Sequence, residues 1–150
     1  MEYRSQAQRE VHERITPFVR DLFGSCAQAQ PDVPGWSVAM GSALVHVLVL
    51  PWGEASAVIV NRAYVVTDAE LTPDLMHFLL EKNHSVLFGS FGVDDDGDIF
   101  VGHTLYGPSC DQEELEYSVR AVLSVADDAD DEIRSRWGGR RALDRARTPC

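Results

Sequence analysis

The segment from Ala43 to Val66, ALVHVLVLPWGEASAVIVNRAYVV, carries the clearest structural signal in the chain. Two runs rich in valine, leucine and isoleucine, Ala43–Leu50 and Ala55–Val66, are separated by the turn residues Pro51-Trp52-Gly53. Apolar β-branched runs bounded by proline and glycine favour β-strands. Because the link between them is so short, the two strands must be antiparallel neighbours in one sheet.

A third strand and an amphipathic helix are predicted on the N-terminal side of this segment. Trp36–Met40 is a further short apolar run and predicts the strand. Earlier in the chain, apolar side chains recur at spacings of three and four from Val11 to Cys26, which predicts the helix. Pro17 interrupts it, so that either the helix kinks or Thr16 caps a second start. We expect the kink, because the apolar stripe continues in register across the proline.

A helix and a hairpin are predicted on the C-terminal side. Thr72 is a suitable N-cap for a helix over Pro73–Lys82, because its hydroxyl can accept hydrogen bonds from the first backbone amides. Two further apolar runs, Ser85–Val93 and Asp98–Tyr106, flank the dipeptide Asp96-Gly97. This arrangement is typical of a β-hairpin.

A long last helix is predicted from Asp111 to Gly138-Gly139. Its apolar residues alternate steps of four and three in one stripe: Leu115, Val119, Val122, Ala126, Ala129 and Ile133. The resulting order, α-βββ-α-ββ-α, predicts an α+β fold with a single antiparallel sheet of about five strands and helices packed on it. We expect one domain over residues 1–139 and a polar C-terminal tail over residues 140–150.

Composition argues against several classes of function. The chain of 150 residues has a net charge of −11, which disfavours nucleic acid and an anionic membrane surface as partners. Its longest apolar run, Leu44–Leu50, is far too short to cross a bilayer, and no apolar signal-peptide core is visible. We therefore expect a cytoplasmic protein whose cysteines, Cys26, Cys110 and Cys150, are free thiols.

A series of short strings runs in order along roughly Gly35 to Gly139. They are Val49-Leu-Pro-Trp-Gly53, Leu71-Thr-Pro-Asp-Leu75, Leu79-Leu-Glu-Lys-Asn83 with Phe88-Gly-Ser-Phe91, Asp94-Asp-Asp-Gly-Asp-Ile99 with His103-Thr-Leu105, Asp111 to Tyr117, and Ala126 to Glu132 ending in Arg136-Trp-Gly-Gly139. Together they resemble the YbjN family and the type III secretion chaperones related to it. The resemblance implies a type III secretion chaperone-like fold and a non-enzymatic, usually dimeric protein that holds a segment of a partner polypeptide. It supplies no catalytic motif.

The predicted hairpin is apolar on both of its faces. One face is expected to pack on the helices, and it consists of Leu87, Phe91, Val93, Ile99, Val101 and Leu105. The opposite face carries the candidate partner-binding residues, which are Val86, Phe88, Phe100 and Tyr106. A fully solvated face would rarely use such side chains. A helix of the same chain, a second subunit or a client segment must therefore cover them.

Other motifs have plainer interpretations. The acidic string Asp94–Asp98 lacks two ligands of an EF-hand loop, so a hairpin turn explains it. The run Asp127–Glu132 falls mostly opposite the apolar stripe, which favours a solvated helix face over a metal or basic-partner site. His46 and His103 are expected to be half-buried and hydrogen-bonded, since no histidine has a second ligand at metal-binding spacing. Cys110, at a helix start, is either a thiol of lowered pKa or an incidental loop thiol.

No nucleophile elbow or phosphate-binding loop occurs in the sequence, so no catalytic residue, metal or cofactor is predicted. The residues and the resemblance together predict a non-catalytic, chaperone-like homodimer that binds and shields a segment of a partner protein. The alternative is a regulatory or scaffold homodimer, of the sensory-transduction-regulator type, whose apolar sheet face serves self-association. A small-molecule sensor or an enzyme, with a polar pocket at His103 or Cys110, is the third hypothesis.

Overall fold

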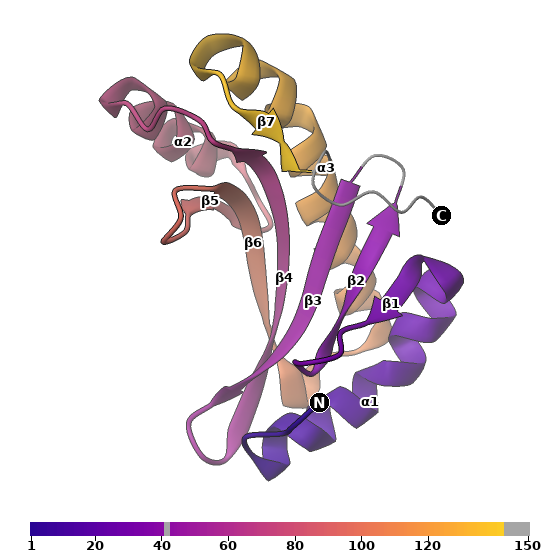
Figure 1. The fold of residues 1–150 in the computed structure, drawn as a ribbon. Coiled ribbons are helices and arrows are strands. Elements are labelled where there is room, and N and C mark those ends of the chain that lie inside the picture. Colours follow the sequence, from indigo (N-terminus) through magenta and orange to yellow (C-terminus); the bar gives the residue numbers. More distant parts are fainter. Residues whose placement is uncertain (41–42, 143–150) are drawn as a thin grey trace.

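The chain folds as one sheet with α-helices, and the computed structural model describes residues 1–40 and 43–142 (Figure 1). The helices are α1 (Gln6–Phe23), α2 (Pro73–Ser85) and α3 (Gln112–Trp137), with 3-10 turns at Gly24–Cys26 and Gly107–Ser109. The strands are β1 (Ala27–Ala29), β2 (Gly35–Met40), β3 (Ala43–Trp52), β4 (Ser56–Thr67), β5 (Ser90–Val93), β6 (Ile99–Tyr106) and β7 (Arg140–Arg141). The predicted α+β class and order of the long elements are confirmed.

Every strand pairing in the sheet is antiparallel, in the order β1-β2-β3-β4-β6-β5. The predicted pairing of the two long apolar runs is confirmed, with Leu48 of β3 opposite Val60 of β4. Strand β4 is the centre of the sheet, because it pairs with β3 on one side and with β6 on the other. Residues on β4 are therefore positioned by neighbours on both sides.

The described residues form seven strands, where the sequence predicts about five. The two additional strands, β1 and β7, are too short to leave a recognisable alternation of apolar and polar residues. Strand β7 pairs with the end of β4, at the start of the segment predicted to be a polar tail from residue 140. Ion pairs from Arg141 to Asp130 and Asp131 hold it there. The rest of that tail, from residue 143, and the Gly41-Ser42 link lie outside the described residues.

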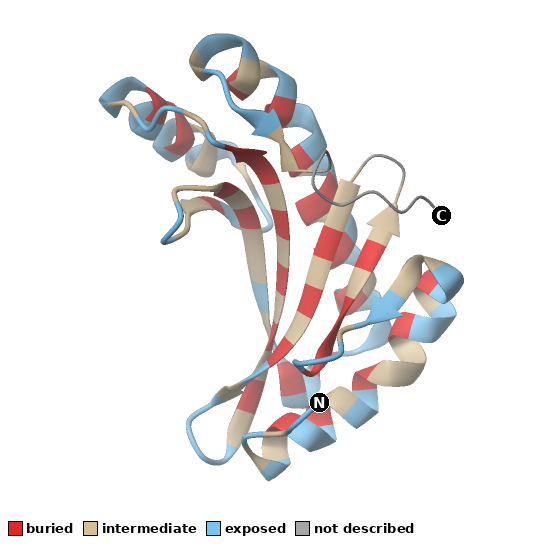
Figure 2. Cartoon of the chain, viewed as in Figure 1, coloured by how far each residue is buried: buried red, intermediate tan, exposed pale blue. Residues whose placement is uncertain are grey.

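Helices α1 and α3 cover one face of the sheet and form the core with it. The core-facing side chains of β3, β4 and β6 alternate with less buried ones, as the bands along the strands in Figure 2 show. The predicted stripe of α3, from Leu115 to Ile133, is buried against this face. Helix α2 lies beside β5 at the sheet edge. Among residues 1–40 and 43–142, no helix is long and apolar enough to span a membrane.

The helix boundaries follow signals in the sequence. Thr72 caps α2 by accepting a hydrogen bond from the backbone N–H of Leu75 at 3.1 Å. Asp111 and Glu114 form a reciprocal capping box at the start of α3, in which each side chain accepts from the backbone N–H of the other. Helix α1 continues through Pro17 as one helix, with its stripe buried on both sides of the proline.

The strand predicted from Ser85 to Val93 is wrong in its first half. Helix α2 continues to Ser85, and strand β5 begins only at Ser90. The side chain of Asn83 explains this, because its Oδ1 accepts from the Phe91 N–H at 2.6 Å and its Nδ2 donates to the Phe91 carbonyl at 3.2 Å. These bonds fasten the helix end to β5 and leave the connecting residues as a loop. Leu87, predicted to face the helices, is 90% exposed there.

Candidate partner-binding surface

The face of the sheet opposite α1 and α3 is rich in apolar side chains, and we call it the open face. Its side chains alternate with those of the core and are only partly buried. It consists of Ser37, Ala39, Leu44, His46, Leu48, Leu50, Val58, Val60, Arg62, Tyr64, Phe100, Gly102, Thr104 and Tyr106. An antiparallel sheet usually keeps its second face polar when water covers it. The composition of the open face is that of a surface that becomes covered.

The structure separates the four residues predicted to bind a partner. Phe100 and Tyr106 lie on the open face, as expected from the alternation along β6. Val86 instead follows the end of α2 and packs partly buried against the core. Phe88 meets the ring of His103 edge-on, on the side of the sheet that α3 covers. The cause is the late start of β5, since residues 85–89 do not alternate between two faces.

An aromatic platform forms at the β5–β6 end of the open face. The ring of Phe100 lies across Gly92 and Gly102, where a β-carbon would meet the ring atoms at 2.5 Å and 3.4 Å respectively. A side chain at Gly92 would therefore displace the ring. The guanidinium of Arg62 stacks on this ring, with Cζ 4.1 Å from the centroid. Tyr64 meets the other side of Phe100 edge-on, at 6.3 Å between centroids.

Polar partners surround the platform on both sides. The Nδ1 atom of His46 accepts from Gln30 at 3.0 Å and lies 3.2 Å from the Ser37 hydroxyl. Burial, together with the charge of Arg62, lowers the pKa of His46 below its ordinary value, so this ring is neutral at pH 7. The Asp94 carboxylate accepts the backbone N–H groups of Asp96 and Asp98, which confirms the hairpin turn predicted for the acidic string.

A second apolar cluster lies at the other end of the open face, at the tip of the β3–β4 hairpin. Trp52 is 63% exposed and Tyr106 is 50% exposed, and their rings meet edge-on at 6.1 Å. Leu50 and Val58, which are opposite each other in the register, lie beside them. Apolar side chains thus extend along the sheet on both sides of Arg62.

A buried polar network lies on the opposite side of β4, under α3. Asn61 donates to the Ser118 hydroxyl at 2.6 Å, and this hydroxyl lies 2.8 Å from Nδ1 of His103. Ser118 thus hydrogen-bonds both Asn61 on β4 and His103 on β6. The half-buried, hydrogen-bonded state predicted for His46 and His103 is therefore confirmed. Ser118 is only 1% exposed, so this Ser–His pair is out of reach of a substrate.

Cys110 is not an activated thiol. Burial first, and then the charges of Glu114 and Asp111, raise its pKa to about 11. The hypothesis of a lowered pKa at this helix start is wrong, because the side chain points into the core and is fully buried.

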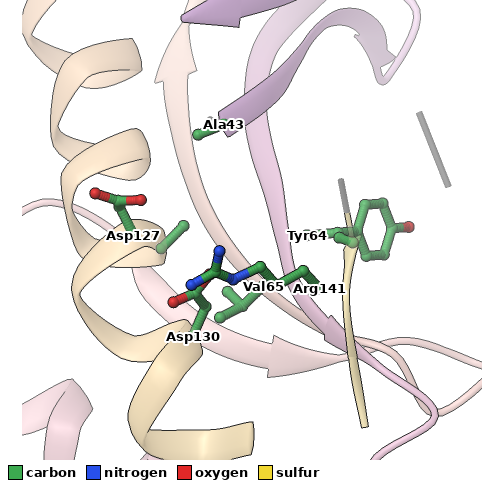
Figure 3. A pocket seen from close by; sticks show the side chains of 8 residues that line it. Ala43, Tyr64, Val65, Asp127, Asp130 and Arg141 are labelled. Carbon is green, nitrogen blue, oxygen red and sulfur yellow. The ribbon is translucent and has the colours of Figure 1, made fainter. Parts of the chain in front are cut away.

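The acidic run of α3 is largely balanced within the chain. Figure 3 shows a small pocket between α3, β4 and the region of β7, in which Arg141 reaches Asp130. Their ion pair measures 2.9 Å. Glu132 pairs with Lys82 at 3.2 Å and with Arg136 at 3.4 Å. These contacts connect α3 to β7 and α2. Asp130 is buried, at 9% exposure, so the run is a solvated helix face only in part.

Sequence reasoning missed Arg62 and Tyr64, although both continue the alternation along β4. The residues of β4 between Ala57 and Ala63 alternate strictly between the core and the open face. A count of that alternation places Val58, Val60, Arg62 and Tyr64 together on one face. The signal is present in the sequence, but the predicted binding residues came from the hairpin of β5 and β6 alone.

Comparisons with known proteins agree with this architecture. Residues 9–145 match the family described as the T3SS (YopN, CesT) and YbjN peptide-binding chaperone 1. No curated protein matches the sequence. Several solved structures share the fold, and three of them are complexes. The HopA1–SchA chaperone–effector complex matches with a TM-score of 0.61 and 8% identity, over 82% of this chain and 96% of that chain.

The other two structures are also complexes. The ExsC–ExsE complex matches with a TM-score of 0.64 and 15% identity, over 86% of this chain and 96% of that chain. The Yersinia pestis type III secretion chaperone SycH, in complex with a stable fragment of YscM2, matches with a TM-score of 0.58 and 14% identity, over 79% of this chain and 98% of that chain. With the family match over residues 9–145, the chain belongs to the family of type III secretion and YbjN peptide-binding chaperones.

Proposed function

We propose that the protein is a non-catalytic chaperone that holds a segment of a partner polypeptide on its open face. The observation that carries the proposal is the composition of this face, where partly exposed leucine, valine and aromatic side chains extend from Phe100 to Tyr106 and Trp52. Water contact with this many apolar side chains is unfavourable, at about 25 cal/mol for each Å² of apolar surface. An apolar extended segment that lies on the face would remove that surface from water.

The family supports this function, and so do the complexes that share the fold. One of these complexes pairs a chaperone with its effector, and another pairs a secretion chaperone with a fragment of YscM2. For the present chain, we propose that Phe100 and Tyr106 are partner-binding residues of the open face. We assign Val86 and Phe88 to a different surface, at the end of α2.

We also propose that the protein is a homodimer, formed through α2 and the loop that leads to β5. Leu80 of α2 is 69% exposed and Leu87 is 90% exposed, and Met76 and Phe88 are exposed beside them. Isolated exposed leucines are common, but four large apolar side chains on one edge of the sheet are typical of an interface. A dimer at this edge would leave the open face free for a partner. We propose further that the protein acts in the cytoplasm, where Cys26 and Cys110 stay reduced.

A selection of peptides from a phage-displayed library of random dodecapeptides tests the main proposal. We expect the wild-type protein to enrich peptides with alternating apolar residues. A selected peptide should bind the variant Tyr106→Ser at least about tenfold more weakly, because an aromatic anchor buried by a partner contributes about 2 kcal/mol or more.

The matched control is Tyr117→Ser, which removes a tyrosine that is 63% exposed on α3, away from the open face. Binding to this variant should stay at the wild-type level. The proposal fails if the wild-type protein selects no peptide, or if both tyrosine variants bind the selected peptide as tightly as the wild-type protein does.

A further inference from the structure

The open face carries a single cation, and it lies at the centre. Arg62 occupies the middle of the open-face series of β4, with His46 opposite it on β3 and Gly102 opposite it on β6. His46 is neutral at pH 7, because burial and the charge of Arg62 lower its pKa. Among the described residues of the open face, Arg62 is therefore the only side chain with a full positive charge.

The guanidinium of Arg62 is held in place but has no anionic partner in the described chain. Its plane rests on the Phe100 ring, which the glycines at 92 and 102 allow to lie flat. Its Nε atom is buried and, among the described residues, has no hydrogen-bond partner. No carboxylate of residues 1–40 and 43–142 forms an ion pair with it. Asp94 is near enough to be influenced by its charge, and Tyr64 hydrogen-bonds to both groups. The backbone of the β5–β6 turn also engages the Asp94 carboxylate, which leaves no described carboxylate in contact with Arg62.

A partly desolvated guanidinium that no carboxylate contacts directly favours a carboxylate ligand. The planar group offers parallel N–H donors that match the two oxygens of a carboxylate, and such charge-assisted bonds are about twice as strong as neutral ones. The apolar surroundings strengthen the pairing further, because they lower the effective dielectric constant. The stack on Phe100 fixes the guanidinium before the ligand arrives, so less side-chain entropy is lost on binding.

Resting on the proposed function, we infer that the open face selects extended segments that place one aspartate or glutamate over Arg62, between apolar side chains. A side-chain carboxylate fits better than a chain terminus. The apolar surface continues past Arg62 in both directions, to Val60 and Val58 on one side and to Tyr64 and Phe100 on the other. A terminus bound at Arg62 would leave half of this surface exposed. A phosphate-rich partner is disfavoured by the net charge of −11.

Selections from the dodecapeptide library on variants of Arg62 test the inference. The wild-type protein should enrich one acidic position flanked by apolar residues at alternate positions. The variant Arg62→Met keeps the bulk of the side chain, and its selected peptides should lose the acidic position. The variant Arg62→Glu should enrich lysine or arginine at that position instead. Arg62→Lys should retain the acidic preference, although more weakly, because it keeps the charge without the planar fork.

A selected peptide is then remade with its acidic residue replaced by glutamine. Wild-type protein should bind the glutamine peptide about tenfold more weakly, as expected for the loss of one charge-assisted pair. Arg62→Met should bind the two peptides equally well. Arg120→Met, which removes an exposed arginine of α3, serves as the control and should discriminate like the wild-type protein. Circular dichroism confirms that each variant is folded.

Two results would overturn the inference. One is that the wild-type protein selects apolar peptides without an acidic position and Tyr106→Ser still weakens their binding. In that case the proposed function stands, and the inference about Arg62 fails. The other is that Arg62→Met keeps the acidic preference, which would place the carboxylate on another group. If the wild-type protein selects no peptide at all, the proposed function and this inference fail together.

Discussion

At the scale of single residues, three histidines connect the stability of the fold to pH. Burial lowers the pKa of His12, His46 and His103 below the ordinary value of 6.5. His12 stacks on Trp36 with centroids 4.5 Å apart, His46 accepts a hydrogen bond from Gln30 through Nδ1, and Nδ1 of His103 is hydrogen-bonded to the Ser118 hydroxyl. Each ring is therefore held in its neutral form in the folded protein. Protonation of these rings is easier in the unfolded chain.

This difference sets the sign of the pH dependence. Between about pH 6.5 and the lowered pKa values of the three histidines in the folded protein, the unfolded chain binds more protons than the folded protein does. The free energy of unfolding therefore falls as the pH falls through this range. We expect urea denaturation to show a lower free energy of unfolding at about pH 5.5 than at about pH 7.5. The variant His46→Gln should show a smaller loss between these two values.

The control is Gln112→Ala, which changes an exposed, uncharged side chain at the start of α3 and should leave the loss unchanged. An equal loss in His46→Gln and in the wild-type protein would contradict the assignment of a lowered pKa to His46.

Residue environments could be predicted from sequence only where the secondary structure was right. The hydrogen-bonded, half-buried state of His46 and His103 follows from a polar residue within an apolar strand, and both strands are present. Val86 and Phe88 were placed on a strand face that does not exist, because Asn83 fastens the end of α2 to Phe91. That contact depends on two segments meeting in space. No local pattern in the sequence reveals it.

At the scale of elements, α3 depends on its capping box. The Asp111 side chain accepts from the Glu114 N–H at 2.8 Å, and the Glu114 side chain accepts from the Asp111 N–H at 3.2 Å. We expect Asp111→Ala to lower the free energy of unfolding by about 1 kcal/mol, measured from the midpoint of urea denaturation. Gln112→Ala, one residue along, removes no cap and should change it by less than about 0.5 kcal/mol. Equal effects of the two substitutions would show that the box contributes nothing.

The long elements could be predicted from sequence, and the short ones could not. The stripe of α3 repeats over about five turns of helix, and the runs of β3 and β4 are long enough to show their period. Strands β1 and β7 have three and two residues, so their existence depends on pairing with β2 and β4 and on the ion pairs of Arg141. Such strands are consequences of the assembled fold. The same reason hides the open face, which appears only when β3, β4 and β6 are set side by side.

At the scale of the whole molecule, exposed apolar side chains gather on two separate surfaces. The open face lies across the middle strands, and the second surface lies at the edge formed by α2 and the loop before β5 (Figure 1). Two surfaces allow two interactions at once, because neither one covers the other. The sequence alone left three possible covers for one face, which were a helix of the same chain, a second subunit and a client. The arrangement of the fold supports assigning a different surface to each.

Solution mass separates these assignments. Light scattering should give twice the chain mass of 16.6 kDa for the wild-type protein, and the doubly substituted variant Leu80→Glu, Leu87→Glu should give the single chain mass. Charges placed on two leucines that are 69% and 90% exposed in the single chain destabilise an apolar interface without disturbing the core.

Tyr106→Ser should remain dimeric, because its site lies on the open face. The opposite result, a dimeric leucine variant and a monomeric Tyr106→Ser, would make the open face the self-association surface and favour the regulatory or scaffold homodimer. A wild-type protein of single mass would exclude both dimers and leave the α2 edge without an assigned partner.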